Sequence, residues 1–402
     1  MKKITFLGDI MCEEPLLRAS KKKNHYDFTP VFAGCKSLFS GSDLVVGNLE
    51  TIFAGKKAGY TDSLFSFNTP DGFAKAMSDS GIGMVTLATN HSLDRDIPGL
   101  SRTIELLDRL GVDHIGACRS AEERNAVFIR GFDGKKVSFL NYTYGTNLNE
   151  SPFVVPEEEY YRLNLLMPQK KAVSRAPKGI RGKISKTIYR LIPLKQLLTI
   201  KKLLGRDCAN RYTDTLDPES IKEEYLDRIR ADVERAKSES DIVVVCLHIG
   251  GQFNEMPGEQ VRYFTELFSG LGVDFLINTH AHVVQPCERA GSTFVAHCLG
   301  NFSISPSSIY VPHELKPEYS ITLHLYVGEA EPKLTFSILK IVESRDHQIS
   351  VLPADILLKE LEENEDDNGI KALREDVTFI YNRFTGNQCD SINIQGEYPI
   401  EV

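Results

Sequence analysis

Residues Val273 to Gln285 read V-D-F-L-I-N-T-H-A-H-V-V-Q. The apolar run at the start of this stretch predicts a short buried strand, and two imidazoles, His280 and His282, follow directly after it. In an extended segment residues i and i+2 point to the same face, so both rings are expected to reach one pocket. Neutral imidazole is a common metal ligand, although paired histidines are also found simply hydrogen-bonded in a core. The stretch therefore predicts a candidate metal site at a strand end.

Polar side chains occupy the same position after other apolar runs. Each of these runs ends within a few residues of a polar group, namely Asp9, Glu50, Asn90 with His91, and His248. Ligands of open α/β sheets bind outside the carboxyl ends of the strands. Taken singly, Asp9 and Asn90 could be turn residues, Glu50 a solvated charge, and the histidines ordinary hydrogen-bonded side chains. Their repetition at several strands favours one shared site.

This set of donors is sufficient for one or two divalent cations. Two metal ions can clamp the attacking and leaving oxygens of a phosphoester displacement, and these ligand types suit manganese, iron and zinc alike. One carboxylate is expected to bridge the two ions. The expected ligands are Asp9 and Glu50 as the anionic oxygens, Asn90, His248 and His280 on one ion, and His282 on the other.

His91 lies next to an expected ligand and would be free to protonate a leaving oxygen. Asp94, three residues further on, could orient the His91 ring through a carboxylate–imidazole hydrogen bond. It could equally cap a helix expected to begin at Pro98. Both roles stay open from the residues alone.

Strand-like and helix-like patterns alternate along the chain, which predicts an α/β sandwich with mixed sheets. Asp71 is the expected N-cap of one helix, and a hairpin is expected to turn at Asp133-Gly134. The strands are expected at 4–7, 44–46, 84–88, 112–115, 127–129, 137–142, 242–247, 273–277, 293–296, 321–327 and 334–341. The helices are expected at 27–39, 71–80, 98–110, 218–237, 260–271 and 357–381.

The composition is that of an ordinary soluble globular protein, with 42% hydrophobic and 25% charged residues among 402. The eight cysteines are scattered, a pattern that favours reduced thiols. The first apolar run meets Gly8 and Asp9 after four residues, too early for a secretory signal, and no run is long enough to span a membrane. A cytoplasmic location is therefore expected, with membrane association left open by the segment described next.

Residues 170–206 hold 12 Lys and Arg and no Asp or Glu, in a chain whose net charge is −8. Apolar residues lie between these charges at near-helical spacing: Ile188, Leu191, Leu194, Leu198 and Leu204. Such a segment can lie on an anionic membrane surface, grip a polyanion, or pack on the core with a solvated basic face. Nucleic acid is not an expected partner, because the rest of the chain is acidic and contains no recognised binding motif.

Six short motifs occur in an order that resembles the CapA family of poly-γ-glutamate capsule-synthesis proteins, over roughly residues 4–303. They are G-D-I-M at Gly8, G-N-L-E-T at Gly47, L-A-T-N-H-S-L-D at Leu87, H-I-G-G-Q-F at His248, T-H-A-H-V-V-Q-P at Thr279 and L-G-N-F at Leu299. The resemblance implies a four-layer α/β/β/α sandwich like that of the calcineurin-like metallophosphoesterases. It also places Asn48, Gln252 and Asn301 beside the substrate or behind the ligands.

The chain departs from the family patterns at three places. The second motif of metallophosphoesterases usually carries Gly-Asp, whereas this chain has Glu50 two residues beyond Asn48. Met11 stands where metallophosphoesterases usually have the histidine of D-x-H, and a thioether is a poor ligand for such cations. Ile249 and Gln252 replace residues of the H-W-G-x-E pattern. The first metal would therefore be short of protein ligands, and it could be weakly held, completed by water or Glu13, or absent.

The resemblance implies a metal-dependent hydrolase of a small-molecule or polymeric anionic substrate in capsule or cell-envelope polymer metabolism. The alternatives are a non-catalytic accessory that binds an anionic polymer or a synthase at the membrane, and a γ-glutamyl peptide hydrolase. The expected organisation is a core in two halves, 1–150 and 216–345, with a basic insert at 151–215 and an acidic helical extension at 346–402.

Overall fold

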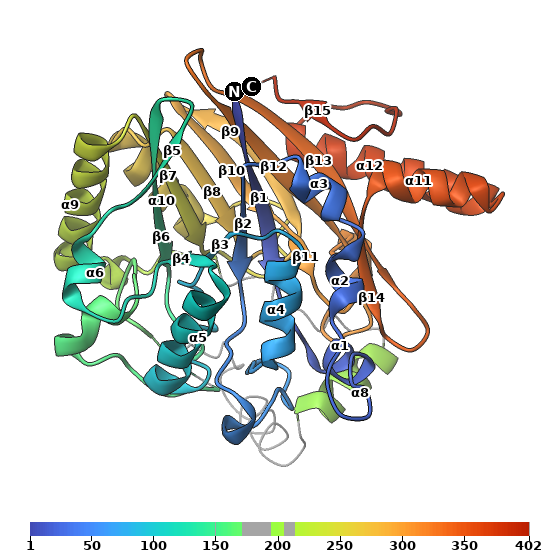
Figure 1. Ribbon diagram of the computed structural model, residues 1–402, viewed down its shortest axis with the longest axis horizontal. Helices are drawn as coiled ribbons and strands as arrows, with labels where there is room; N and C mark the ends of the chain where they lie inside the picture. Colours follow the sequence, from blue (N-terminus) through green and yellow to red (C-terminus); the bar gives the residue numbers. More distant parts are fainter. Residues whose placement is uncertain (149, 171–193, 205–213, 402) are drawn as a thin grey trace.

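Two mixed β-sheets face each other at the centre of the molecule. The computed structural model describes residues 1–148, 150–170, 194–204 and 214–401 (Figure 1). The first sheet has the order β14-β13-β12-β1-β2-β3-β4, with β11 paired to β1 and β15 paired to β13; the second has the order β5-β6-β7-β8-β10-β9. The first comprises β1 (Lys2–Ile10), β2 (Leu44–Leu49), β3 (Met84–Thr86), β4 (Asp113–Ile115), β11 (Asn301–Ser303), β12 (Tyr319–Val327), β13 (Lys333–Glu343), β14 (Ile349–Pro353) and β15 (Tyr398–Pro399). The second comprises β5 (Phe128–Phe132), β6 (Lys135–Thr143), β7 (Ile242–His248), β8 (Phe275–Thr279), β9 (Val284–Ala290) and β10 (Thr293–Leu299).

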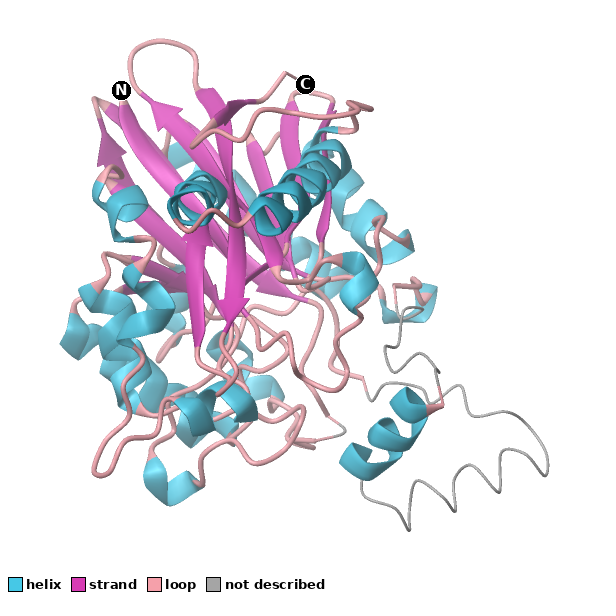
Figure 2. Cartoon of the chain, turned by 90° about the vertical axis from the view of Figure 1, so that its right-hand side faces the viewer, coloured by secondary structure: helices cyan, strands magenta, loops and turns pink. Residues whose placement is uncertain are grey.

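Helices cover the outer faces of both sheets, and the strands gather between them (Figure 2). One apolar cluster joins the first sheet to α1 (Glu14–Ala19), α2 (Thr29–Ala33), α3 (Lys36–Ser40), α4 (Asp71–Asp79) and α5 (Asp96–Leu110). A second cluster fills the space between the sheets, and a third joins the second sheet to α9 (Glu223–Glu239) and α10 (Glu259–Gly270). The predicted four-layer α/β/β/α sandwich with mixed sheets is confirmed.

Strand β7 shows why these segments fold as central strands. Val243, Val245 and Leu247 pack toward α9 and α10, while Val244 and Cys246 pack between the sheets. Because both faces of the strand are buried, the sequence is a continuous apolar run rather than an alternating one. The strands β1 to β4 run parallel to one another, as do β6, β7, β8 and β10. Their carboxyl ends therefore meet on one side of the sandwich.

The helices match the predictions with local differences. The predicted helix 27–39 is two short helices, α2 and α3, and Asp71 is the first residue of α4, whose N-cap is Pro70. Helix α9 begins at Glu223, after a single 3-10 turn at Pro218–Ser220. The predicted hairpin at Asp133-Gly134 is confirmed by the antiparallel pairing of β5 and β6.

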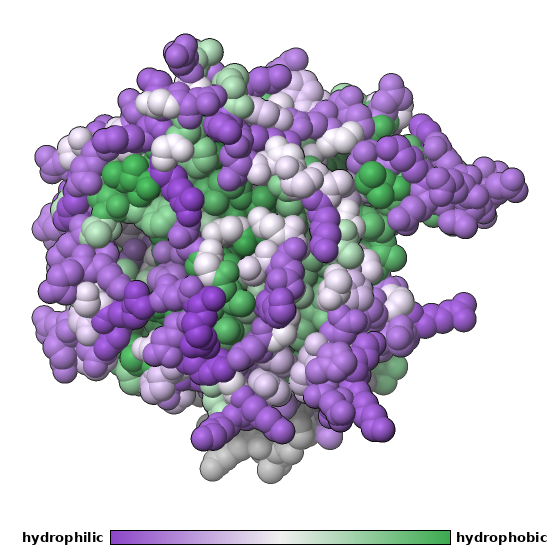
Figure 3. Space-filling view, viewed as in Figure 1, coloured by the Kyte–Doolittle hydropathy of each residue, from purple (hydrophilic) through white to green (hydrophobic). Residues whose placement is uncertain are grey.

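Residues 346–402 add strands β14 and β15 to the first sheet as well as two helices, α11 (Ala354–Glu363) and α12 (Asp367–Thr385). The predicted helical region 357–381 is divided because Glu365 has a φ of +54° and the Asp366 side chain caps α12 by accepting from Gly369 N. Apolar residues of both helices join the cluster between the sheets. The projecting end of α11, on the right of Figure 3, is hydrophilic.

Most of the predicted basic segment, including Ile188 and Leu191, lies outside the described residues. Within it the structure describes α8 (Leu194–Leu203), where the side chains of Ile200 and Leu203 are exposed, as is that of Leu204 directly after the helix. Contact of residues 170–206 with a membrane surface stays a prediction. Among the described residues, no helix is both long enough and apolar enough to cross a bilayer.

Candidate metal centre

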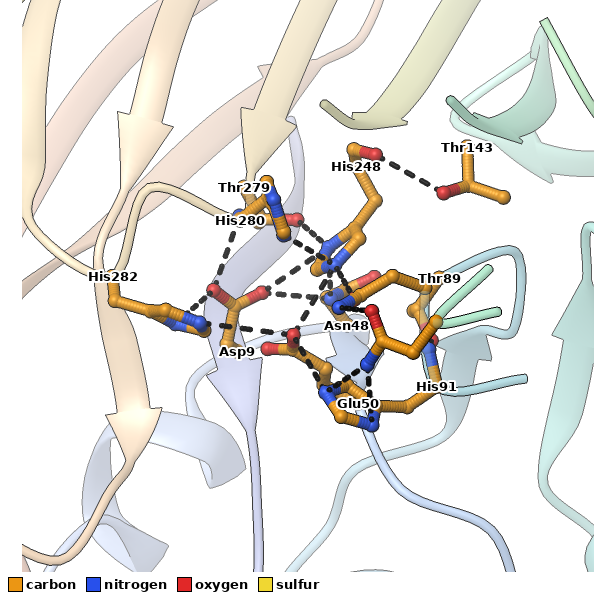
Figure 4. Close-up of polar contacts among 12 residues, drawn as sticks. Asp9, Asn48, Glu50, Thr89, His91, Thr143, His248, Thr279, His280 and His282 are labelled. Atoms are coloured by element: carbon orange, nitrogen blue, oxygen red, sulfur yellow. Dashed lines mark hydrogen bonds and ion pairs between the residues drawn. The ribbon is translucent and has the colours of Figure 1, made fainter. Parts of the chain in front are cut away.

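The carboxyl ends of five strands bring the predicted ligands into one cluster (Figure 4). Asp9 is the second-last residue of β1 and Glu50 follows β2, while Asn90 lies four residues beyond β3. His248 ends β7, and His280 and His282 follow β8. All of these side chains are buried. The six predicted ligands, spread over more than 270 positions of the chain, therefore lie together.

Glu50 is the centre of this cluster. Its side chain is fully buried, and among the described residues neither carboxylate oxygen has a hydrogen-bond partner. Three imidazole nitrogens lie around Oε1: His248 Nε2 at 3.3 Å, His282 Nε2 at 3.8 Å and His91 Nε2 at 3.8 Å. A buried carboxylate without hydrogen bonds is costly unless a positive charge faces it. This environment fits a bound cation.

Two groups of donors share Glu50. The first is Glu50, His248 and His280, and the second is Asp9, Glu50 and His282; within each group the donor atoms lie within 4.8 Å of one another. Glu50 is thus the carboxylate that belongs to both groups, while Asp9 belongs to one. Nitrogen and carboxylate donors of this kind fit manganese, iron or zinc.

Asp9 is held from both sides by polar groups. Its Oδ1 accepts from Asn48 Nδ2 at 2.7 Å, and its Oδ2 accepts from the His280 backbone N at 3.1 Å. Burial opposes ionisation of Asp9, but the hydrogen bond with His282 and the imidazoles of His248 and His282 outweigh it and lower the Asp9 pKa. Asp9 is therefore a carboxylate anion at neutral pH.

His282 shows the complementary effect. Its Nδ1 lies 3.2 Å from Asp9 Oδ2. Burial opposes protonation of the ring, but the charges of Glu50 and Asp9 and the hydrogen bond with Asp9 raise the His282 pKa to about 9. The two carboxylates thus create a position that favours positive charge.

His248, Asn90 and His280 form the second side of the cluster. His248 Nε2 lies 2.7 Å from Asn90 Oδ1 and 3.1 Å from His280 Nδ1. The other ring nitrogen of His248 hydrogen-bonds Thr279 Oγ1 at 2.9 Å, which fixes the ring orientation. Burial, followed by the neighbouring imidazoles, lowers the His280 pKa well below its usual value. His280 is therefore neutral, as a ligand must be.

The backbone that places His280 and His282 differs from the prediction. Strand β8 ends at Thr279, and the two histidines have φ values of +88° and +58°. Their rings, 5.9 Å apart, converge through this left-handed loop and not through alternation along an extended strand. Non-glycine residues in this region are strained, and such strain gathers at functional sites.

His91 and Asp94 are hydrogen-bonded, His91 Nδ1 lying 2.7 Å from Asp94 Oδ2. The His91 ring stacks on Phe67 at 4.3 Å, and the Phe67 backbone N donates to the same oxygen of Asp94 at 2.6 Å. Helix α5 begins at Asp96 with Arg95 as its N-cap, so Asp94 is not the helix cap. Asp94 orients the ring and leaves Nε2 directed toward Glu50.

Two of the three residues expected beside the ligands do contact them. Asn48 donates to Asp9 and lies 3.1 Å from His248 Nδ1, while its Oδ1 accepts from Thr86. Asn301 Oδ1 lies 2.9 Å from His282 Nδ1, and Asn301 Nδ2 donates to the His282 carbonyl. Gln252 is half-buried one residue before Phe253, whose ring lies 5.6 Å from His282. No contact of the Gln252 side chain with the ligands occurs among the described residues.

Met11 and Glu13 do not complete the first metal position. Met11 belongs to the apolar cluster on the helix side of the first sheet, and its backbone N donates to Ser303. Glu13 Oε2 accepts from Ser305 N at 2.5 Å, and its Oε1 accepts from the Tyr310 hydroxyl. Both carboxylate oxygens of Glu13 are therefore engaged. The group of Asp9, Glu50 and His282 therefore has fewer protein donors than the other group, in which Asn90 joins Glu50, His248 and His280.

Asn147 was missed by the sequence analysis. Its Oδ1 accepts from Asn90 Nδ2 at 3.1 Å, its Nδ2 lies 3.2 Å from His91 Nε2, and its backbone N donates to the Asn90 carbonyl. It thus connects an expected ligand to the expected proton donor. Asn147 lies four residues after β6. A search for polar side chains after the predicted strand 137–142, like the search after the other strands, would have pointed to this loop.

The family of bacterial capsule synthesis proteins PGA_cap matches residues 3–306 of the chain. The PGA biosynthesis protein CapA of Bacillus subtilis (strain 168) is 21% identical over 300 residues, which cover 74% of this chain and 62% of that protein. The capsule biosynthesis protein CapA of Bacillus anthracis is 22% identical over 348 residues, which cover 84% of this chain and 70% of that protein. The match thus spans less than two thirds of the length of the Bacillus subtilis relative.

Proposed function

Because the chain belongs to the PGA_cap family of bacterial capsule synthesis proteins, we propose that it is a metal-dependent hydrolase of the phosphoesterase type. Its substrate would be an anionic small molecule or polymer in the metabolism of poly-γ-glutamate, the capsule or another cell-envelope polymer. The observation that carries the proposal is Glu50, a fully buried carboxylate that has no hydrogen bond among the described residues and lies among the imidazoles of His91, His248 and His282.

One or two divalent ions, manganese, iron or zinc, would be held here, with Glu50 shared between them. His248, His280 and Asn90 would hold one ion, and Asp9 and His282 the other. Such ions lower the pKa of water and offset negative charge that develops on a substrate. Asn48, Thr279 and Asn301 keep the ligand side chains in place through their hydrogen bonds.

His91 would act on the leaving group. Asp94 accepts from Nδ1 and fixes the ring, so Nε2 is the nitrogen that can deliver a proton to a leaving oxygen. The ring is also held by stacking on Phe67. Both contacts give the proton donor a fixed position, on which general acid catalysis depends.

Met11 favours a second candidate function. Because its side chain packs in the core and supplies no donor, a non-catalytic accessory that binds an anionic polymer or a synthase could keep only a remnant of the metal centre. A γ-glutamyl peptide hydrolase is a further candidate, since the same donors could serve hydrolysis of an amide. Metal content and turnover separate these candidates.

The test begins with elemental analysis of the purified protein, followed by assays with phosphomonoesters, phosphodiesters and γ-glutamyl amides. We expect at least one equivalent of a transition metal per chain. His248→Ala and Glu50→Gln should lose most of this metal and at least about 100-fold in turnover, because each removes a central donor. His347→Ala, at an exposed histidine, is the matched control and should behave like the native protein.

Circular dichroism and the melting temperature of each variant establish that it is folded. Absence of bound metal and of turnover in the folded native protein would favour the accessory. Turnover of γ-glutamyl amides alone would identify the peptide hydrolase. Turnover that survives in folded His248→Ala would contradict the proposed ligand set.

A further inference from the structure

Two adjoining hollows lie on the side of the sandwich where β4 approaches β6. Their volumes are about 240 and 270 Å³, and both are lined by Arg124, Asn164, Asp232 and Arg235. Helices α6 (Ala121–Asn125) and α9 form the outer wall, on the left of Figure 1. None of the predicted metal ligands lines either hollow. We call these two hollows together the arginine groove.

Asn164 lines both hollows and carries an unused side-chain acceptor. Only 9% of the residue is exposed, and its side-chain Oδ1 is buried without a hydrogen-bond partner among the described residues. Its backbone is fully engaged, since Asn164 N donates to Gly116 and its carbonyl accepts from Thr143 N. A buried amide oxygen without a donor is unfavourable, and a ligand N–H would satisfy it.

Three arginines line the two hollows, namely Arg124, Arg228 and Arg235, against the two carboxylates of Asp232 and Glu123, and Glu123 pairs with Arg119. Asp232 accepts two hydrogen bonds from Arg124, at 2.9 and 2.6 Å, and one from the Tyr142 hydroxyl. Arg235 also lies 3.7 Å from Asp232 and donates to the carbonyl of Asn125. Because Asp232 is already saturated by Arg124 and Tyr142, the charge of Arg235 is only partly offset. The groove is therefore basic, in a chain with a net charge of −8.

Arg228, which lines the second hollow only, adds another positive charge. Its guanidinium lies over the rings of Tyr160 and Tyr225, at 4.8 and 5.3 Å from their centroids. No carboxylate among the described residues pairs with it. Stacking on two rings holds the planar guanidinium group of Arg228 in place and leaves its N–H groups to bind an anion.

These features together match a ligand that alternates carboxylates with amide N–H groups. Guanidinium forks bind carboxylates in a bidentate manner, and the Asn164 oxygen accepts an N–H. We propose that the arginine groove binds a short glutamyl oligomer, with its carboxylates on Arg228 and Arg235 and an amide N–H on Asn164. This assignment rests on the proposed function for the identity of the polymer and adds a binding site separate from the metal centre.

The test is isothermal titration of the full chain with a γ-linked glutamate pentamer at low salt. Arg228→Gln should weaken binding about tenfold, because it removes one charge-assisted contact. Asn164→Ala should weaken it several-fold. The matched control is Arg230→Gln on the same helix, whose guanidinium pairs with Glu223 and Asp227, and it should bind like the native protein.

His248→Ala distinguishes this inference from the proposed hydrolase. Unchanged pentamer binding in His248→Ala supports a groove separate from the metal centre, whether or not the native protein hydrolyses anything. Pentamer binding that is lost in His248→Ala and retained in both Arg228→Gln and Asn164→Ala would overturn the groove and leave the hydrolase standing. Tighter binding of adenosine monophosphate than of the pentamer would also overturn it. Equal melting temperatures of the variants exclude misfolding as the cause of lost binding.

Discussion

Asp94 lies outside the predicted ligand set and reaches the site only through His91. Its Oδ2 contacts His91 Nδ1 at 2.7 Å, and no contact between Asp94 and the ligands is found among the described residues. A residue of this kind affects the reaction by fixing the tautomer and orientation of its partner. Metal binding and proton delivery are therefore separable at the level of single side chains.

Asp94→Asn tests this separation. The amide keeps the size of the side chain but removes the charge that stabilises a protonated His91. We expect turnover to fall by about 10- to 100-fold while the metal content stays unchanged. Steady-state kinetics with elemental analysis gives both quantities, and Asp79→Asn, at an exposed carboxylate of α4, is the control. A parallel loss of metal would show that Asp94 supports the ligands and not the proton donor.

Sequence patterns identified residues of this site better than they identified its geometry. The six predicted ligands are together because each lies at or shortly after the carboxyl end of a strand, and the ends of neighbouring parallel strands meet. The convergence of His280 and His282 was predicted for the wrong reason, since positive φ angles are set by tertiary contacts and not by alternation. Asn147 was missed because its role depends on where a loop folds back over Asn90.

At the scale of elements, the C-terminal helix α12 closes the space between the two sheets. Phe384 is fully buried, and its ring lies 4.9 Å from that of Phe336 on β13. Phe379, on the same helix, is 41% exposed and lies beneath the guanidinium of Arg383. Phe384 and Phe379 are thus the same residue type on the same helix, and they differ in how deeply the side chain is buried.

Phe384→Ala should lower the free energy of unfolding by about 3 to 5 kcal/mol, because it leaves a cavity between the helix and the sheet. Phe379→Ala should change it by less than about 1 kcal/mol, as is usual for exposed positions. Urea denaturation followed by circular dichroism measures both values. Equal losses in the two variants would mean that α12 does not depend on this buried contact.

Long periodic elements were predictable, and short or interrupted ones were not. The continuous apolar run of β7 and the amphipathic pattern of α5 are strong local signals. The sequence analysis missed strands β9 and β14. Gln285, Glu288 and Arg289 break the apolar pattern of β9, and β14 is a short strand at the edge of its sheet. Pairing with a neighbour, which the local sequence does not encode, makes these segments strands.

At the scale of the whole molecule, the last residues of the chain are tied back to the first sheet. The Glu397 carboxylate accepts from Lys3 Nζ on β1 at 2.9 Å, from the Tyr326 hydroxyl on β12 at 2.6 Å, and from Thr335 Oγ1 on β13. Burial opposes ionisation, but these hydrogen bonds outweigh it and lower the Glu397 pKa to about 2. One side chain therefore joins three strands and the C-terminal segment.

The lowered pKa makes part of the stability depend on pH. Since the carboxylate is favoured in the folded state, its contribution is complete above the unfolded pKa of about 4.5 and is lost as the pH falls toward 2. The side chain is 32% exposed, so solvent screening reduces this contribution to about 1 kcal/mol. Glu397→Gln should accordingly unfold at lower urea concentration than the native protein at pH 7, and the difference should vanish near pH 2.

Glu331→Gln, in the exposed turn between β12 and β13, is the control and should match the native protein throughout. A difference for Glu397→Gln that persists unchanged at pH 2 would show that the effect comes from shape or packing and not from the charge.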